Sequence, residues 1–339
     1  TLFRSAVIVY AWVSALLMIG SVILAAALMV ALDRRTAPRP QLASREGARA
    51  VLAVGGWNSL TLLASNMHIR LDQLLMNLFL GLKLNAVFTV AVTLGSYARM
   101  TTVGVTSGVD AVAARLSARA PGGAVAVLLH HSTRLHALVA LPAAAGILLL
   151  TGPILHVWLG RRLDPQSMQM AVTLTQLILI GVTARAISDG WFRVLYGAGH
   201  IRRYAPLVLA GGLANPVIAI GLLLTLPDPI RYTGPAISYA AIIVSLHFVA
   251  APRIVADVLG LRYREILAPV LRPLAATLIM APAPVVGRVV ISTWTPLSLG
   301  AVIFAAGAVY AGAAWLLVVR DHERRRIRAA TLGRLGLAH

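Results

Sequence analysis

Residues 168–198 read MQMAVTLTQLILIGVTARAISDGWFRVLYGA. The first half of this stretch is apolar over several helical turns, and the whole stretch exceeds the roughly 20 residues that an α-helix needs to cross a bilayer. The second half carries Arg185, Asp189 and Arg193, and a spacing of four residues places them on one face of a helix. This stretch therefore predicts a membrane-spanning helix with charged groups inside the membrane.

The composition of the whole chain also indicates a membrane protein. Of the 339 residues, 59% are hydrophobic and 12% are charged, whereas soluble domains hold about half apolar and a quarter charged residues. The mean hydropathy is +0.83. The chain has no cysteine, which excludes disulfides, thiolate metal ligands and cysteine nucleophiles. We predict an all-α polytopic membrane protein.

Apolar windows of about 20 residues or more recur along the chain, with only short segments between them. They lie at residues 7–32, 50–80, 85–113, 135–159, 168–198, 205–226, 234–252, 267–286 and 296–319. We expect about nine transmembrane helices and no soluble domain between them.

Basic residues between the windows predict the orientation of the chain. Alternate segments hold 19 and 6 Lys or Arg residues, and the richer segments are 33–49, 114–134, 199–204, 253–265 and 320–339. Because cytoplasmic loops carry the excess of Lys and Arg, we expect the C-terminus inside and Thr1 outside. An outside N-terminus without Met or a signal peptide leads us to expect a fragment of a longer transporter.

The net charge of +19 would indicate a nucleic-acid binder in a soluble chain. Here all basic residues except Lys83 are Arg and most lie between apolar windows, so we assign them to topology and to membrane lipids, and expect no nucleic acid. The sequence has no phosphate-binding loop, dinucleotide fingerprint or nucleophile elbow. We expect a transporter that is not an enzyme and needs no cofactor.

Three histidines, His130, His131 and His136, lie close together at the start of the fourth window. A metal site needs several converging ligands, and no carboxylate accompanies these histidines. We interpret them as residues of the membrane interface and expect no bound metal.

The ionisable groups inside the windows carry the functional information, because a charge at mid-bilayer costs at least about 2.5–3.5 kcal/mol. They are Arg70, Asp72, Arg99, Asp110, Arg185, Asp189, Arg193 and Arg272. Their net charge is positive, and guanidinium groups bind phosphate through two parallel hydrogen bonds. A wet cavity lined by these arginines would suit a phosphate or pyrophosphate. The alternative is a salt-bridge network that only holds the helices in register. Arg272 lies near a window end, where we expect a cytoplasmic anchor.

Short motifs in a fixed order give the chain a resemblance to a known family. They are GWNSL at 56–60, RLDQLL at 70–75, NAVFTVA at 85–91, LP at 141–142, LHVWLG at 155–160 and VLYGAGHIRR at 194–203. Over residues 50–265 this succession resembles the polysaccharide-biosynthesis flippases of the multidrug/oligosaccharidyl-lipid/polysaccharide exporter superfamily. Those proteins move undecaprenyl-pyrophosphate-linked oligosaccharides, such as O-antigen units of lipopolysaccharide, across the bacterial inner membrane. Residues 107–112 lack the Pro that usually closes the second of these helices.

The resemblance implies two six-helix lobes around a central cavity that opens to each side in turn. The nine windows would be equivalent to helices 6–14 of that fold. Residues 1–49 would hold the last helix of the N-terminal lobe and a cytoplasmic loop, 50–265 the C-terminal lobe, 266–319 an extra helix pair and 320–339 a basic cytoplasmic tail. The implied partners are the lipid-linked oligosaccharide, the missing N-terminal lobe and glycan polymerase machinery.

For a substrate of this kind we assign hypothetical roles to the charged groups. The pyrophosphate head group would be bound by three arginines, which are Arg99, Arg185 and Arg193. Asp189 would orient their side chains, and Arg70 and Asp72 would act in gating or coupling. Two alternatives keep the architecture and change the cargo: a lipid II flippase or a multidrug exporter. A third, from another class, is a membrane-embedded glycosyl- or phosphotransferase.

Overall fold

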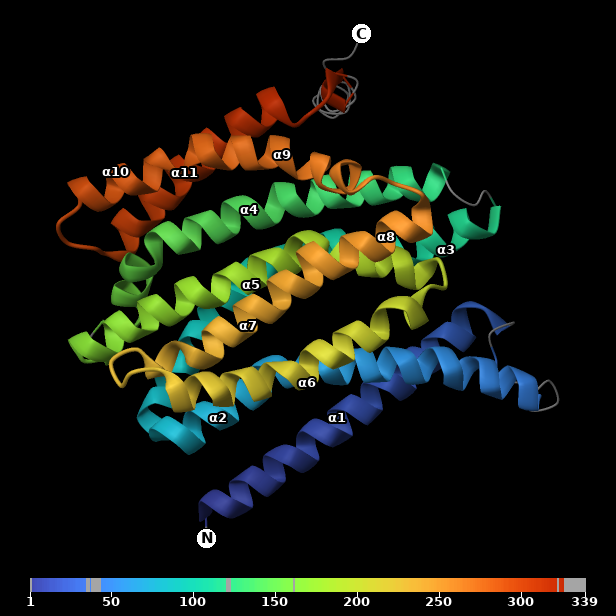
Figure 1. Ribbon diagram of the computed structural model, residues 1–339, viewed down its shortest axis with the longest axis horizontal. Coiled ribbons are helices and arrows are strands. Elements are labelled where there is room, and N and C mark those ends of the chain that lie inside the picture. The colour runs from blue at the N-terminus through green and yellow to red at the C-terminus, as the bar shows by residue number, and fades with distance from the viewer. Residues whose placement is uncertain are drawn as a thin grey trace. The chain divides into compact units, whose positions relative to one another are not determined.

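The computed structural model describes residues 2–34, 37, 44–119, 123–160, 162–321 and 323–325. All regular structure in these residues is helical, and they contain no strand. The helices are α1 (Leu2–Leu32), α2 (Arg45–Thr106), α3 (Val109–Arg119), α4 (Gly123–Leu159), α5 (Pro165–Gly197), α6 (Ile201–Thr225), the 3₁₀ turn η3 (Arg231–Thr233), α7 (Gly234–Val244), the π-helical segment η4 (Ser245–Ala250), α8 (Ala251–Leu259), α9 (Tyr263–Met280), α10 (Pro282–Val290) and α11 (Pro296–Leu317) (Figure 1). Most of the basic tail predicted at 320–339 lies outside the described residues.

Eight helical stretches in the described part of the chain are long and apolar enough to cross a bilayer, judged by length and composition. The apolar windows of the sequence predict about nine. The difference arises in α2, because this 62-residue helix covers two of the predicted windows.

α2 consists of two antiparallel arms joined at Gly81. This residue has φ 85° and ψ 174°, a conformation that glycine adopts because it lacks a Cβ atom. Gln73 Nε2 donates to Thr89 Oγ1 at 3.4 Å, although sixteen residues of straight helix would span about 24 Å. The arms therefore fold back on each other, along the windows predicted at 50–80 and 85–113. The number and direction of bilayer crossings remain predictions.

The chain divides into two compact units, residues 1–55 and 56–339, and the boundary falls within α2. The first unit contains α1, which is apolar and leaves nearly all of its described side chains exposed. A helix that is hydrophobic all round suits a lipid environment. The second unit holds the folded core.

α5 is the central helix of the second unit, with α4 along one side and α7 along another (Figure 1). Phe88 of α2, Leu174 and Ile178 of α5 and Ile243 of α7 lie in one buried cluster. A second cluster surrounds Trp191 of α5. Because lipid tails are as apolar as these side chains, close packing rather than water exclusion holds the helices together.

Glycines permit the closest helix contacts. A Cβ atom on Gly190 of α5 would lie 2.3 Å from Ser132 Oγ of α4, and one on Gly212 of α6 would lie 3.0 Å from the Ala64 carbonyl oxygen of α2. Small residues at such crossings let helix backbones approach each other. The last three helices, α9, α10 and α11, pack against α4, and the Tyr310 hydroxyl of α11 donates to the Leu138 carbonyl of α4.

Candidate functional site

A cavity of about 430 Å³ lies between the helices of the second unit. Both arms of α2, together with α3, α5, α6, α7 and η4, form its wall. The lining residues are Asn58, Thr61, Leu62, Ser65, His68, Arg99, Asp110, Arg185, Asp189, Phe192, Arg193, Tyr196, Tyr204, Val208, Ile243, Leu246 and His247. The cavity brings together Arg99, Arg185, Arg193 and Asp189, four of the six site residues that we predicted from the sequence.

Asp189 joins two of the predicted arginines. Its Oδ2 atom lies 3.1 Å from both Nε and Nη2 of Arg99, and its Oδ1 atom lies 3.8 Å from Nε of Arg185. The side chains of Asp189 and Arg185 are less than one-fifth exposed. The sequence left open which arginine pairs with Asp189, and the structure places the shortest contact with Arg99 on a different helix.

Arg193 faces a different carboxylate. Its Nη1 atom lies 3.9 Å from Oδ2 of Asp110, at the start of α3. This distance fits an ion pair but is too long for a hydrogen bond. The Arg193 side chain is 45% exposed, so its donors are accessible from the cavity.

The charges of the lining do not cancel. Three guanidinium groups stand against the two carboxylates of Asp110 and Asp189, which leaves one positive charge in excess before the histidines are counted. Charged groups inside a membrane protein usually face a wet cavity or pair with one another. Here they line a cavity and also pair with one another. The arrangement can bind an anion, with guanidinium forks as donors.

Arg70 and Asp72 lie outside the cavity. Arg70 is exposed, and its Nη1 atom donates to Gln73 Oε1 at 3.5 Å. Asp72 is fully buried, and its Oδ1 atom accepts a hydrogen bond from Asn215 Nδ2 at 2.9 Å. The two residues therefore have separate surroundings, and neither touches the predicted head-group arginines.

A chain of buried polar groups links Asp72 to the cavity wall. Asn215 Nδ2 also lies 3.3 Å from the carbonyl oxygen of His68, which lines the cavity, and Ser238 Oγ donates to Asn215 Oδ1 at 3.0 Å. Within the described residues, Asp72 Oδ2 and both ring nitrogens of His68 have no hydrogen-bond partner. Sequence reasoning missed His68 and Asn215, although each is a polar residue inside an apolar window.

His247 is a further cavity residue that the sequence analysis missed. It lies in the π-helical segment η4, its Nδ1 atom is hydrogen-bonded to Ser188 Oγ, and its ring centroid lies 5.0 Å from that of Phe192. π-Helical turns are rare and often occur at functional sites. Hydrophobic periodicity does not reveal a single π turn, so the histidine itself was the sole sequence signal at this position.

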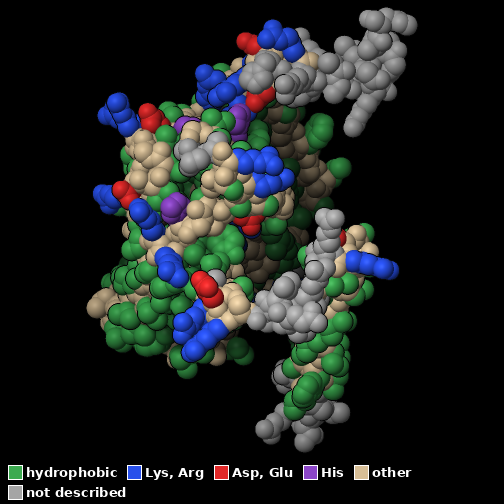
Figure 2. Space-filling view, turned by 90° about the vertical axis from the view of Figure 1, so that its right-hand side faces the viewer, with side chains coloured by type: hydrophobic (Ala, Val, Ile, Leu, Met, Phe, Trp, Pro, Cys, Tyr) green, Lys and Arg blue, Asp and Glu red, His purple; other side chains and the backbone are tan. Residues whose placement is uncertain are grey.

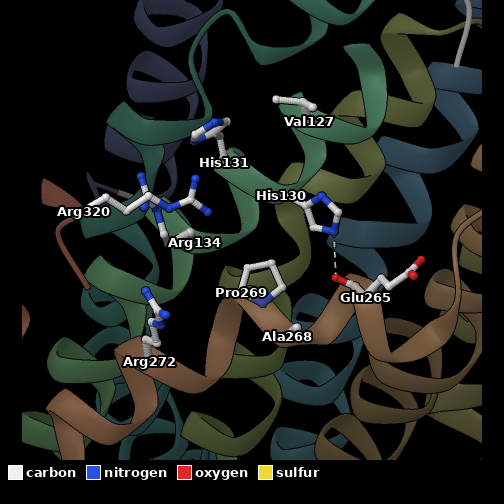
Figure 3. Close-up of a pocket in the computed structure, with 9 residues that line it drawn as sticks. All are labelled: Val127, His130, His131, Arg134, Glu265, Ala268, Pro269, Arg272 and Arg320. Atoms are coloured by element: carbon white, nitrogen blue, oxygen red, sulfur yellow. Dashed lines mark hydrogen bonds between the residues drawn. The ribbon is translucent and has the colours of Figure 1, made fainter. Parts of the chain in front are cut away.

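The three clustered histidines separate in the structure. His130 and His131 line a second pocket together with Arg272 (Figure 3). His136 is fully buried, next to Gly190 of α5, and its Nδ1 atom lies 2.7 Å from the Ser132 carbonyl oxygen. Our interpretation of all three as interface residues therefore needs correction for His136. Among the described residues, no three His, Cys, Asp or Glu side chains converge as a metal site.

No family model, curated protein or solved structure matches this chain. The described helices and the cavity define the class of this protein: an α-helical, multi-pass membrane protein with a positively charged cavity between its helices.

Proposed function

We propose that this chain is part of a flippase that carries an undecaprenyl-pyrophosphate-linked oligosaccharide across the bacterial cytoplasmic membrane, for polysaccharide or lipopolysaccharide biosynthesis. The observation that carries the proposal is the cavity in which Arg99, Arg185 and Arg193 exceed the two nearby carboxylates. A pyrophosphate supplies the missing negative charge, and its oxygens match the planar donor pairs of guanidinium.

Asp189 would compete with the substrate for the arginine side chains. It contacts Arg99 and Arg185, so a bound pyrophosphate would compete with it for the same donors. A ligand shifts a conformational equilibrium only by binding one state more tightly than the other. If pyrophosphate replaces Asp189 on the two arginines, the contact that joins α2 to α5 changes. Pyrophosphate would then bind one conformation more tightly than the other.

Arg193 and Asp110 would form a weaker contact at the edge of the same cavity. Their 3.9 Å separation makes this pair easier to open than a hydrogen-bonded one. Asp72 would serve in coupling, because it is buried and linked through Asn215 to the cavity wall. Arg70 is exposed and lies outside the cavity, so we assign it no role in the transport cycle.

The positive charge of the cavity favours a pyrophosphate-linked substrate over the cationic substrates of a multidrug exporter. A multidrug exporter of cationic compounds would place a positive ligand beside an excess of guanidinium groups, which repel it. A lipid II flippase carries the same pyrophosphate, so the charge of the cavity does not distinguish lipid II from a lipid-linked oligosaccharide.

The test is complementation of a flippase-deficient strain by the full-length protein that contains this chain. Arg185→Ala should abolish surface polysaccharide while membrane expression stays at the wild-type level. Arg202→Ala, which removes an exposed arginine of α6 outside the cavity, is the matched control and should complement fully. Normal surface polysaccharide in the Arg185→Ala strain would refute the proposal.

A further inference from the structure

A second cavity, of about 640 Å³, lies apart from the first, between α4, α9 and the residues after α11. It is lined by Val127, His130, His131, Arg134, Glu265, Ala268, Pro269, Arg272 and Arg320. Three of these side chains are arginines, and each comes from a different part of the chain. The proposed flippase cycle uses none of them.

The three arginines converge, whereas the acidic residue of the lining does not join them. Figure 3 shows the guanidinium groups of Arg134, Arg272 and Arg320 on one side of the pocket, and the Glu265 carboxylate at the other side, directed away from them. Glu265 Oε2 accepts a hydrogen bond from the backbone N–H of Arg262 at 2.8 Å. Glu265 is thus engaged in capping α9 and does not neutralise the arginines.

Few carboxylates neutralise this cluster. Arg134 pairs with Glu323, yet its Nη1 atom is buried without a hydrogen-bond partner. In the described part of the chain, the side chains of Arg272 and Arg320 form no ion pair. Converging positive charges repel one another. A bound anion would relieve this repulsion and use the free donors.

An apolar cavity of about 410 Å³ adjoins this site. It is lined by Leu271, Arg272, Ala275, Leu316 and Leu317, so Arg272 belongs to both cavities. Leu271 and Leu316 are 64% and 70% exposed, which leaves an open hydrophobic surface between α9 and α11. A small inorganic anion would leave this apolar surface uncovered, whereas an acyl chain would bury it.

The location also suits a lipid head group. Figure 2 views the second unit from the end where α4 begins, and Lys and Arg side chains gather around this end. It is the end that the sequence predicts to be cytoplasmic. Basic pockets between membrane helices on the cytoplasmic side are typical binding sites for anionic lipid head groups.

We propose that these adjoining cavities form a binding site for an anionic phospholipid. Arg134, Arg272 and Arg320 hold the phosphate oxygens, and an acyl chain lies against Leu271 and Leu316. Such a lipid bridges α4, α9 and α11, and so fastens the last helices to the rest of the second unit.

The test is native mass spectrometry of the complete chain, purified in detergent, delipidated and titrated with cardiolipin, phosphatidylglycerol or phosphatidylcholine. Wild-type protein should bind both anionic lipids more tightly than phosphatidylcholine. The double variant Arg272→Gln/Arg320→Gln should weaken cardiolipin binding by at least about tenfold, because two charge-assisted contacts are lost. Both arginines are exposed, so this variant should keep the wild-type circular dichroism spectrum.

The matched control is Arg202→Gln/Arg253→Gln, which removes two exposed arginines at the same basic end but outside both cavities. It should bind cardiolipin as the wild type does. Equal binding by the Arg272/Arg320 variant, or an equal loss in the control, would overturn the proposal. Displacement of bound lipid by millimolar inorganic phosphate would also overturn it, since that result assigns the arginines to a free anion.

A photoactivatable phosphatidylglycerol gives a second measurement on unmodified protein. It should label peptides that contain residues 127–134 and 268–275. Labelling confined to other helices would exclude the site, whatever the behaviour of the variants.

Discussion

Arg99 and Asp189 are 90 residues apart in the sequence, and their side chains meet with Nε 3.1 Å from Oδ2. The contact joins the second arm of α2 to α5 beside the cavity. It depends on the chain reversal at Gly81, which turns this arm back along the first. Because Asp189 also contacts Arg185, one carboxylate serves two guanidinium groups.

Loss of the Asp189 carboxylate should lower the stability of the protein. Asp189→Asn leaves Arg99 and Arg185 without their common counter-charge, and we expect a stability loss on the order of 1–3 kcal/mol. Thermal unfolding of the purified chain in detergent measures it. The double variant Arg99→Gln/Asp189→Asn should recover part of the loss, because fewer uncompensated charges remain. If the stability loss of the double variant equals the sum of the losses of the two single variants, Arg99 and Asp189 are not energetically coupled.

The buried carboxyl of Asp72 should depend on Asn215. Asn215→Ala removes the donor to Asp72 Oδ1 and leaves both carboxyl oxygens without a described partner, so we expect a loss of about 1–3 kcal/mol. Asn66→Ala, on the exposed face of α2, is a control that also removes an amide and should change stability by less. The unfolding temperatures of the two variants in detergent test this prediction. Equal effects of the two substitutions would count against a stabilising hydrogen bond from Asn215 to Asp72.

Any side chain added at Gly197 should destabilise the protein. A Cβ atom there would lie 2.1 Å from the Asp110 carbonyl oxygen and 2.9 Å from Ala113 Cβ, so α3 must move, at a cost of about 1–3 kcal/mol. At Gly221, in contrast, an added Cβ meets nothing within 4 Å, and alanine should be neutral or slightly stabilising. Comparison of the melting temperatures of Gly197→Ala and Gly221→Ala tests this. A stable Gly197→Ala protein would show that α3 adjusts freely.

Asp164 should contribute to stability in a pH-dependent way. It accepts hydrogen bonds from Lys83 Nζ, 2.9 Å from Oδ2, and from the backbone and side chain of Ser167 at the start of α5. These contacts, with Lys83 as the largest cause, hold the pKa of Asp164 well below its usual range. A lowered folded-state pKa stabilises the protein above the ordinary carboxyl pKa of about 4, and this stabilisation is lost as the pH falls toward the folded-state value.

Asp164→Ala should therefore lower the melting temperature at pH 7, and the difference from the wild type should shrink as the pH is lowered from 4 to 3. Lys83→Met should reproduce part of the effect, because the hydrogen bonds from Ser167 remain. A difference that stays constant between pH 7 and pH 3 would contradict the assignment of the pKa shift to the folded state.

The sequence by itself determined the class of protein. Long apolar windows predict helices because the bilayer leaves backbone groups no other partner, and the structure places helices along each of them. The same logic, that a charge in an apolar window is costly, selected Arg99, Arg185, Arg193 and Asp189, which line one cavity. It also selected Arg70 and Asp72, which lie outside that cavity. These conclusions rest on local composition, which a sequence displays directly.

Only the tertiary structure decided which charges meet. Helical spacing brings Asp189 near Arg185, but it says nothing of Arg99, which reaches Asp189 from another helix. It likewise did not connect Asp72 with Asn215, 143 residues away. Such pairs depend on how helices cross and on where small residues let them approach each other. Both are properties of packing between segments, and the residue order within one segment does not determine them.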